Sequence, residues 1–358
     1  MRRIKLVVSD LHLGKGVIDE HGHLNVYEDF REDDKFVEFL NHYGGRRHFH
    51  DEVELIINGD FFELLVVDAY DQITNRETEQ TALWKMHRIF AGHPAVFDAL
   101  WTFSARPNNK VTFLIGNHDA SLLWSSVQKL VKERIGPQTE IIETPQYDIG
   151  PIHIEHGNHY EWLHAYNPRN FAYLNERGER VFRMPWGSVF VVEYLSPIKK
   201  SRPYVDKVRP FSMYMKYAFV NDHVFFWRLV IESVRFWLRN RFSRDPVRRR
   251  EFALNPRRMM RSMSHDSMDS AALHILENTR FRYVIFGHSH KSQHRRHEGY
   301  GEYINSGTWT ENISLVLPDI GRRIRRTYVW IDFTDEDNPV VRLKEWHGSH
   351  REEEDVIY

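Results

Sequence analysis

Residues 4–12 read Ile-Lys-Leu-Val-Val-Ser-Asp-Leu-His, a short apolar run that leads directly into Asp10 and His12. The apolar part is rich in β-branched residues and predicts a strand that is buried on both faces. In α/β proteins, binding sites are built at the carboxyl ends of such strands. This stretch therefore predicts an α/β fold and a candidate site at the end of the first strand.

The rest of the chain alternates between strand and helix patterns. Residues 29–43 and 78–103 have the apolar spacing of helices, and the second stretch predicts a break near Pro94. Alternating strands and helices, followed by a strand-rich tail, predict an α/β protein whose sheets are mixed rather than purely parallel. Further strands are predicted at 53–57, 111–115, 281–286, 303–305 and 327–333, with two or three short ones in 141–155.

The composition excludes several kinds of site. The 358 residues include no cysteine, which rules out a disulfide framework, an iron–sulfur cluster held by cysteine and a cysteine-ligated zinc site. The apolar run after Met1 is too short for the core of a signal peptide, and no stretch of about 18 residues is free of charge. We therefore expect a cytoplasmic protein without a transmembrane helix.

Five short polar segments stand where predicted strands end, and four of them directly follow an apolar run. Their side chains offer carboxylates, imidazoles and one carboxamide, a mixture that suits Mn²⁺, Fe, Zn²⁺ or Co²⁺ better than Mg²⁺ or Ca²⁺. Strand alternation predicts that Asp10 and His12 point to the same side, as do His288 and His290. The five segments are Ser-Asp-Leu-His at 9–12, Asn-Gly-Asp-Phe-Phe-Glu at 58–63, Gly-Asn-His-Asp at 116–119, Glu-His-Gly at 155–157 and Gly-His-Ser-His at 287–290.

Each segment taken alone is weak evidence for a metal site. An Asp-x-His pair is more often a surface pair or a helix cap, and Gly-Asp after a strand is more often a turn. All five in this order, each at a predicted strand end, are not explained by coincidence. Two metals held roughly 3.5–4 Å apart would clamp a phosphate and lower the pKa of a bound water, and the resulting hydroxide would attack phosphorus in line.

The order of these motifs resembles the calcineurin-like metallophosphoesterase superfamily, over about residues 4–157 and 281–345. The resemblance implies a four-layer αββα sandwich, with residues 1–358 as a single domain that carries a helical insertion at 160–280. It implies two divalent metals, most simply Mn²⁺. One would be held by Asp10, His12, Asp60 and His290, and the other by a bridging Asp60 with Asn117, His156 and His288.

The same resemblance implies roles for the two residues after Asn117. His118 matches the catalytic histidine of the family, which would contact the phosphate and help to protonate the leaving oxygen. Asp119 would orient His118, as a carboxylate partner fixes an imidazole tautomer. The complete set of ligands counts against the alternative of an inactive scaffold with the same fold.

Residues 10–14, 59–63 and 303–309 look like the bacterial group that contains the UDP-2,3-diacylglucosamine pyrophosphatases. That resemblance implies hydrolysis of a phosphate ester or pyrophosphate in a lipid-linked substrate. The chain departs from the group in its greater length, in His118 where arginine is frequent, and in His-Gly-Asn-His at 156–159 in place of His-Gly-Asp. A two-metal nuclease acting on nucleic acid is the alternative.

The insertion is basic and aromatic. Residues 195–261 contain 17 Lys or Arg against 5 Asp or Glu, with aromatic residues between them. One interpretation is a cap helix packed on the catalytic domain with a solvated polar stripe. Another is an interfacial helix for an anionic membrane surface or a lipid phosphate. Nucleic-acid binding through the arginines at 248–250 and 257–258 is the third, and it fits least because the apolar content exceeds what a stacking surface needs.

A second basic stretch, 294–297, follows the fifth motif. If it lies near the metals, Arg295 or Arg296 would bind a second phosphate group of the substrate. The alternative is a solvated hairpin turn.

Overall fold

The computed structural model describes residues 1–19, 21–70, 72–244, 249–250, 266–316, 320–349 and 354–355. Its larger sheet has seven strands in the order β17-β16-β15-β1-β2-β3-β4. Strands β1 to β4 are parallel, and β15, β16 and β17 add antiparallel strands at one edge. The bounds are β1 Arg3–Val8, β2 Glu52–Asn58, β3 Asn109–Leu114, β4 Thr139–Ile142, β15 Thr327–Asp332, β16 Val340–Glu345 and β17 Glu354–Asp355.

A second sheet has five strands in the order β11-β12-β10-β6-β5. Strand β10 pairs in parallel with both β6 and β12, whereas β5 and β11 are antiparallel edges. Both sheets are therefore mixed, as the sequence predicts. The bounds are β5 Gln146–Ile149, β6 Ile152–Glu155, β10 Tyr283–Phe286, β11 Gln293–His297 and β12 Gly301–Asn305.

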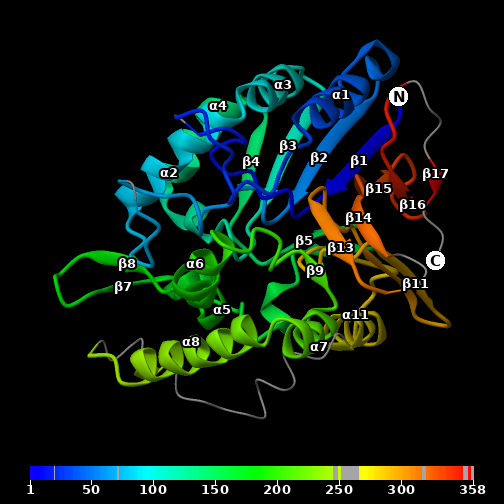
Figure 1. Cartoon of the computed structure of the whole chain (residues 1–358). Helices are drawn as coiled ribbons and strands as arrows, with labels where there is room; N and C mark the ends of the chain where they lie inside the picture. The colour runs from blue at the N-terminus through cyan, green and yellow to red at the C-terminus, as the bar shows by residue number, and fades with distance from the viewer. Residues whose placement is uncertain are drawn as a thin grey trace.

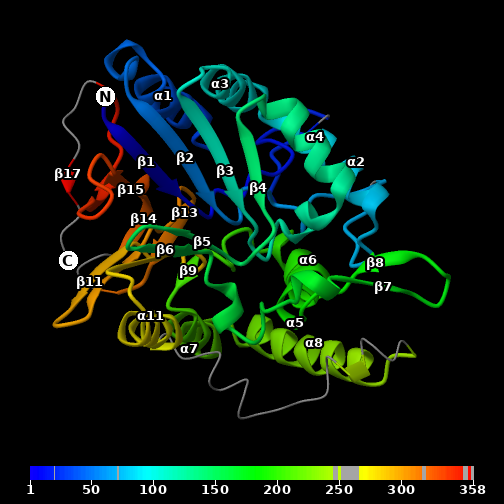
Figure 2. The same ribbon diagram turned by 180° about the vertical axis from the view of Figure 1, so that it is seen from behind.

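The two sheets pack face to face, and each has helices on its outer face (Figures 1 and 2). In β1, Leu6 and Val8 pack with the helical layer, whereas Val7 packs between the sheets with residues such as Ile154 and Ile285. Strand alternation thus buries both faces of β1. The outer helices of the large sheet are α1 Asp33–Tyr43, α2 Glu79–Gly92, α3 Pro94–Ser104 and α4 Ser125–Ile135.

The fourth layer is α11 (Asp266–Asn278), whose Met268 and Leu276 pack on Val284 and Phe286 of the smaller sheet. This arrangement confirms the four-layer αββα sandwich. It also shows that α11, although it lies within the expected insertion at 160–280, is part of the sandwich. That the chain is one domain with an inserted cap stays a prediction.

The insertion is mainly helical, as expected, and also contains short strands that the sequence pattern missed. Strand β9 pairs with β13, which pairs with β14, so a small sheet joins the insertion to the C-terminal part of the chain. No helix in the described part is long and apolar enough to cross a membrane. The bounds are α5 Trp186–Phe190, a π-helical turn Val191–Leu195, α6 Ser196–Lys199, α7 Phe211–Asn221, α8 His223–Arg241, β7 Ala172–Leu174, β8 Arg180–Phe182, β9 Val208–Arg209, β13 Glu311–Ser314 and β14 Gly321–Ile324.

Short 3₁₀ turns complete the described elements. They are η1 Arg46–His48, η2 Ala120–Leu123, η3 Asn158–Tyr160 and η4 Pro168–Asn170. Two of them bear on the site, because η2 follows the third motif and η3 follows the fourth. The third and fourth motifs are thus each followed by a short turn rather than by a further strand.

Candidate metal centre

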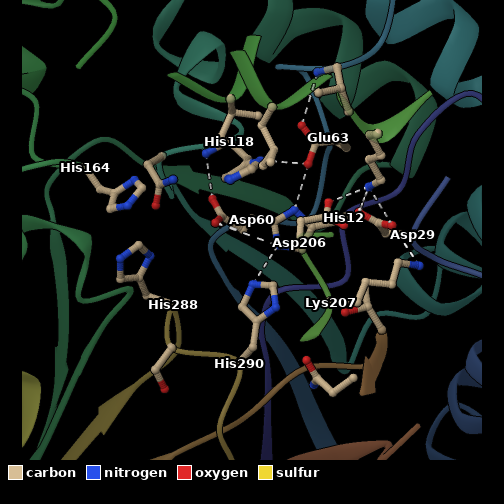
Figure 3. Close-up of a pocket in the computed structure, with 18 of the residues that line it drawn as sticks. His12, Asp29, Asp60, Glu63, His118, His164, Asp206, Lys207, His288 and His290 are labelled. Atoms are coloured by element: carbon tan, nitrogen blue, oxygen red, sulfur yellow. Dashed lines mark hydrogen bonds and ion pairs between the residues drawn. The ribbon is translucent and has the colours of Figure 1, made fainter. Parts of the chain in front are cut away.

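The five motifs meet at one place, the carboxyl ends of strands from both sheets. They follow β1, β2 and β3 of the larger sheet and β6 and β10 of the smaller one. The ligands predicted from the sequence therefore come together in space, although some are more than 270 residues apart (His12 and His290 are separated by 278). Figure 3 shows Asp60, His12 and His290 in the middle of this cluster, with His288 on one side.

The backbone at the ligands is in an uncommon conformation. Within the described part, six residues other than glycine have positive φ, and five of them are predicted ligands: Asp10, His12, Asp60, His288 and His290, at 51–65°. This left-handed region costs free energy for residues with a Cβ, and such strain concentrates at functional sites. Asp10 and His12 lie beyond the end of β1. The prediction that strand alternation aligns them is therefore wrong, and left-handed turns do so instead.

Hydrogen bonds between the loops hold these turns. Asp10 N donates to Gly59 O at 3.2 Å, and His12 N donates to Asp60 O at 3.0 Å. The loops approach so closely that a Cβ on Gly59 would stand 2.5 Å from Nδ1 of His156, and one on Gly116 would clash with the Asp60 carboxylate. Glycine is therefore required at both positions.

Two neighbouring groups of ligand atoms fit the two predicted metals. Asp10, His12 and His290 form the first, with His290 Nε2 3.3 Å from Asp10 Oδ1 and 3.1 Å from His12 Nε2. Asp60, His156 and His288 form the second, with His156 Nε2 3.2 Å from Asp60 Oδ2. Asp60 Oδ2 also lies 4.0 Å from His12 Nε2, so this carboxylate stands between the groups.

Several buried polar atoms of the two ligand groups make no hydrogen bond, which bears on whether cations fit between them. Asp10 Oδ1, Asn117 Oδ1 and His156 Nε2 are buried and make no well-aligned hydrogen bond, and the close contacts of Asp10 and His156 are only with the predicted ligands His290 and Asp60. A buried polar atom left in this way normally costs about 1–3 kcal/mol, so three in one cluster need an explanation. All three belong to the predicted ligand set and offer lone pairs, which two divalent cations would satisfy.

Neighbouring groups set which imidazole nitrogen each ligand presents. His156 Nδ1 donates to the Asn58 carbonyl oxygen at 2.8 Å, which leaves the lone pair on Nε2. His12 Nδ1 lies 3.0 Å from Glu63 Oε2, so its Nε2 likewise faces the cluster. Such outer partners orient metal-binding histidines and increase their basicity.

Glu63, not Asp119, holds the predicted catalytic histidine. His118 Nδ1 lies 2.7 Å from Glu63 Oε2, the same oxygen that contacts His12. The Asp119 carboxylate accepts from Gly116 N at 2.7 Å and from Phe61 N at 2.9 Å. The prediction that Asp119 orients His118 is therefore wrong, because backbone donors of two loops occupy its oxygens.

Charge around His118 favours its protonated form. Burial alone would lower the pKa of His118, but Glu63 and Asp60 raise it to about 9. Burial, together with the charge of Asp60, raises the pKa of Asp119 to about 6. Burial lowers the pKa of His290, and the nearby charges of His12 and Arg209 add to this against the opposing effect of Asp10.

Two residues that were not predicted from the sequence extend the second group of candidate ligands. Glu161 Oε2 lies 3.1 Å from His288 Nε2, and His164 belongs to the same cluster of possible ligands. Burial and the nearby His288 lower the pKa of His164 to about 3, so its ring is neutral. Both follow the fourth motif closely in the sequence, so their spacing from His156 is the signal that could have found them.

A pocket of about 320 Å³ opens over the metal groups. In Figure 3 it extends from His164 and His288 on one side to Asp29 and Lys207 on the other. Arg295 and Arg296 do not line it; they lie on the exposed edge strand β11, where Arg295 Nη1 pairs with Asp269 at 2.9 Å. The structure therefore does not bring these two arginines to the pocket.

The basic residues of the pocket come from the insertion instead: Lys199, Lys207 and Arg209. Lys199 Nζ contacts Asp29 at 2.9 Å and Asp206 at 2.7 Å, and Lys207 Nζ contacts Asp29 at 2.9 Å. Arg209 donates through Nη1 to two backbone carbonyls, those of Asp206 and Val208. No carboxylate of the described residues pairs with Arg209 in this way.

Part of the predicted basic surface cannot be placed. Arg248, Arg257 and Arg258 lie outside the described residues. Arg249 and Arg250 are described and exposed. The described part therefore neither supports nor opposes a track for a nucleic-acid backbone along these arginines.

No family model matches the chain, and no curated protein matches it. Solved structures that align with it include Vps29 from Entamoeba histolytica in complex with Zn²⁺, at 10% identity and a TM-score of 0.33 over 99% of this chain and 98% of that one. A dimetal phosphatase from Danio rerio has 9% identity and a TM-score of 0.36 over 99% and 98%. A phosphoesterase predicted in Streptococcus pneumoniae has 9% identity and a TM-score of 0.30 over 99% of both chains. At these scores the fold rests on the four layers described above.

Proposed function

We propose that this chain is a hydrolase of phosphate esters or phosphoanhydrides that depends on two divalent metal ions. The observation that carries the proposal is the group of buried, unpartnered ligand atoms on Asp10, Asn117 and His156 where five strand ends meet. One metal would be held by Asp10, His12, Asp60 and His290, and the other by Asp60, Asn117, His156 and His288. Bound there, the cations would supply Lewis-acid stabilisation of phosphate oxygens and increase the acidity of a water.

His118 would act as the general acid. Glu63 holds Nδ1 of its ring, and its negative charge favours the imidazolium form. That leaves the Nε2 proton for a leaving oxygen in the pocket. A protonated ring also stabilises negative charge that develops on the phosphoryl group.

Arg209 would bind a second anionic group of the substrate, in the role first expected of Arg295 or Arg296. Lys199 and Lys207 are already paired with carboxylates, whereas Arg209 has guanidinium nitrogens that are not used by its two backbone contacts. A guanidinium binds a phosphate or carboxylate through paired hydrogen bonds. This favours a pyrophosphate or another doubly anionic substrate.

The proposed substrate is linked to a lipid. The support for this is the exposed apolar face of α7 and α8, which belong to the same insertion that brings Arg209 to the pocket. Nucleic acid remains the alternative substrate. An inactive scaffold is disfavoured because no predicted ligand is missing.

Metal analysis tests the core of the proposal. Protein purified with added Mn²⁺ should contain close to two metal ions per chain by plasma mass spectrometry and should cleave bis-p-nitrophenyl phosphate. A His12→Ala, Asp60→Ala double variant should lose both metals and all turnover, whereas Arg295→Ala should keep both. Full metal occupancy in the double variant, or a metal-loaded protein without any phosphoesterase activity, would refute the assignment.

A further inference from the structure

The outward face of helices α7 and α8 carries many large apolar side chains in water. On α8 these residues recur every three or four positions, which places them within one narrow stripe opposite the buried Leu229 and Phe236. Their exposed fractions range from 41% to 71%, so they are not core residues. The stripe consists of Val224, Trp227, Ile231, Val234, Leu238 and Phe242.

Helix α7, which packs against α8, also exposes apolar side chains. Its Met213, Tyr217 and Val220 share one face, opposite the buried Ala218, and are 42%, 62% and 72% exposed. Both views show α7 and α8 along the edge of the molecule that lies opposite α1 and α3 (Figures 1 and 2). Two adjacent helices that each expose several large apolar side chains are rare on a protein that has no partner.

The charges beside this surface are mostly positive. Arg228, Arg235 and Arg239 lie along one side of the α8 stripe and are exposed; Arg235 pairs with Glu232 and Arg239 with Glu193, each at 2.7 Å. Glu232 and Asp222 are the acidic residues of residues 211–244, against six Lys or Arg. An apolar stripe with a cationic border and aromatic residues matches the pattern of helices that lie in a membrane interface.

The charge also distinguishes between two candidate partners of this surface, a second copy of the chain and an anionic lipid bilayer. In a two-fold dimer the same patch would face itself, so the cationic border of one copy would meet that of the other and repel it. An anionic bilayer offers an apolar interior to the stripe and negative headgroups to the border. We propose that the outward face of α7 and α8 docks on the surface of an anionic lipid bilayer.

Docking is independent of the hydrolytic chemistry and can be measured on its own. The intact protein should co-sediment with mixed phosphatidylcholine–phosphatidylglycerol vesicles and much less with phosphatidylcholine vesicles. A Trp227→Asp, Ile231→Asp double variant should bind the mixed vesicles at least about tenfold more weakly, because two buried apolar contacts are replaced by charge. Arg228→Gln and Arg235→Gln should each weaken binding about fivefold at low salt.

Matched controls are available elsewhere on the surface. Trp101 on α3 is 47% exposed and Leu174 on β7 is 70% exposed, so a Trp101→Asp, Leu174→Asp variant makes the same kind of change away from the stripe. It should bind vesicles as the unchanged protein does. Helical circular dichroism and the melting temperature of both variants check that they are folded.

Three results would overturn the proposal. They are absence of vesicle binding by the unchanged protein, equal binding by the Trp227→Asp, Ile231→Asp variant, and a dimer in analytical ultracentrifugation that this variant dissolves. The last result would assign the surface to a second copy of the chain. If the unchanged protein binds vesicles but has no phosphoesterase activity, that result would count against the proposed function alone.

Discussion

The motif loops and helices α7 and α8 hold their functional side chains in opposite ways. In the loops five of the seven predicted ligands are almost fully buried, five have a strained backbone, and a carbonyl or carboxylate oxygen holds the rings of His156 and His12. On α7 and α8 the notable residues are exposed, and regular helix geometry alone aligns them. The comparison suggests that the chemistry depends on tertiary contacts between distant segments, whereas docking depends on one local amphipathic pattern.

Among changes in the motif loops, removal of the predicted general acid should lower turnover most. His118→Ala should lower turnover by roughly 10²–10⁴-fold, because the leaving oxygen loses its proton donor. Metal content should stay near that of the unchanged protein, since the proposal gives His118 no ligand role. Steady-state kinetics and plasma mass spectrometry check the two statements separately, and undiminished turnover would remove His118 from the mechanism.

The buried charges of the sandwich should dominate its stability. His93 Nδ1 lies 2.7 Å from Asp33 Oδ1, and its Nε2 lies 3.4 Å from Glu28 Oε2. Burial lowers the pKa of His93, but these carboxylates raise it to about 9, above its unfolded value near 6.5. The stabilisation is therefore complete below about pH 6.5 and is lost as the pH rises towards 9, a change of about 2–3 kcal/mol.

Denaturant unfolding at several pH values measures this change. His93→Gln should reduce the loss of stability between pH 6.5 and 9, to which His118 also contributes because its pKa is likewise raised to about 9. Arg235→Gln breaks an exposed pair with Glu232 on α8 and should leave the stability curve unchanged. If Arg235→Gln had the larger effect, the contrast between the buried and the exposed region would fail.

Two carboxylates near His118 should be separable by experiment. Glu63→Gln should lower activity by about 10–100-fold, as expected when an outer partner of a metal ligand is lost. It should also lower the pKa of His118, so activity should fall at lower pH on the alkaline side. Asp119→Asn should shift the pH profile less than Glu63→Gln, because Asp119 makes no hydrogen bond to His118 and its charge raises the pKa of His118 less than Glu63 does.

The smallest expected effect is on KM, and it concerns Arg209, which the insertion brings to the pocket beside the motif loops. Arg209→Ala should raise KM about tenfold for a substrate with a second anionic group, because a charge-assisted hydrogen bond is lost. The KM for bis-p-nitrophenyl phosphate, which has one anionic group, should not change, and neither should kcat. Arg202→Ala is the control, since Arg202 belongs to the same basic stretch but does not line the pocket. An equal rise for both substrates would argue against a second anion site.

Much of the fold was predictable because buried strands leave a clear mark in sequence. The runs at 4–8, 53–57 and 111–115 are apolar on both faces and were placed correctly, as was the break before Pro94. Strands β11 and β14 were missed because they are rich in Arg and lie exposed at sheet edges. Their pairing comes from backbone hydrogen bonds to a neighbour, which a local pattern does not record.

For the site, the sequence predicts the candidate ligands and gives the order of the motifs, because each candidate stands within a few residues of a strand end. Only the tertiary structure decided the partners. Glu63 holds His118 because the loops after β2 and β3 lie side by side, and Arg209 reaches the pocket because β9 pairs with β13. The physical reason is that spacing along the chain identifies which groups a strand delivers, whereas hydrogen bonds between distant loops determine which groups meet.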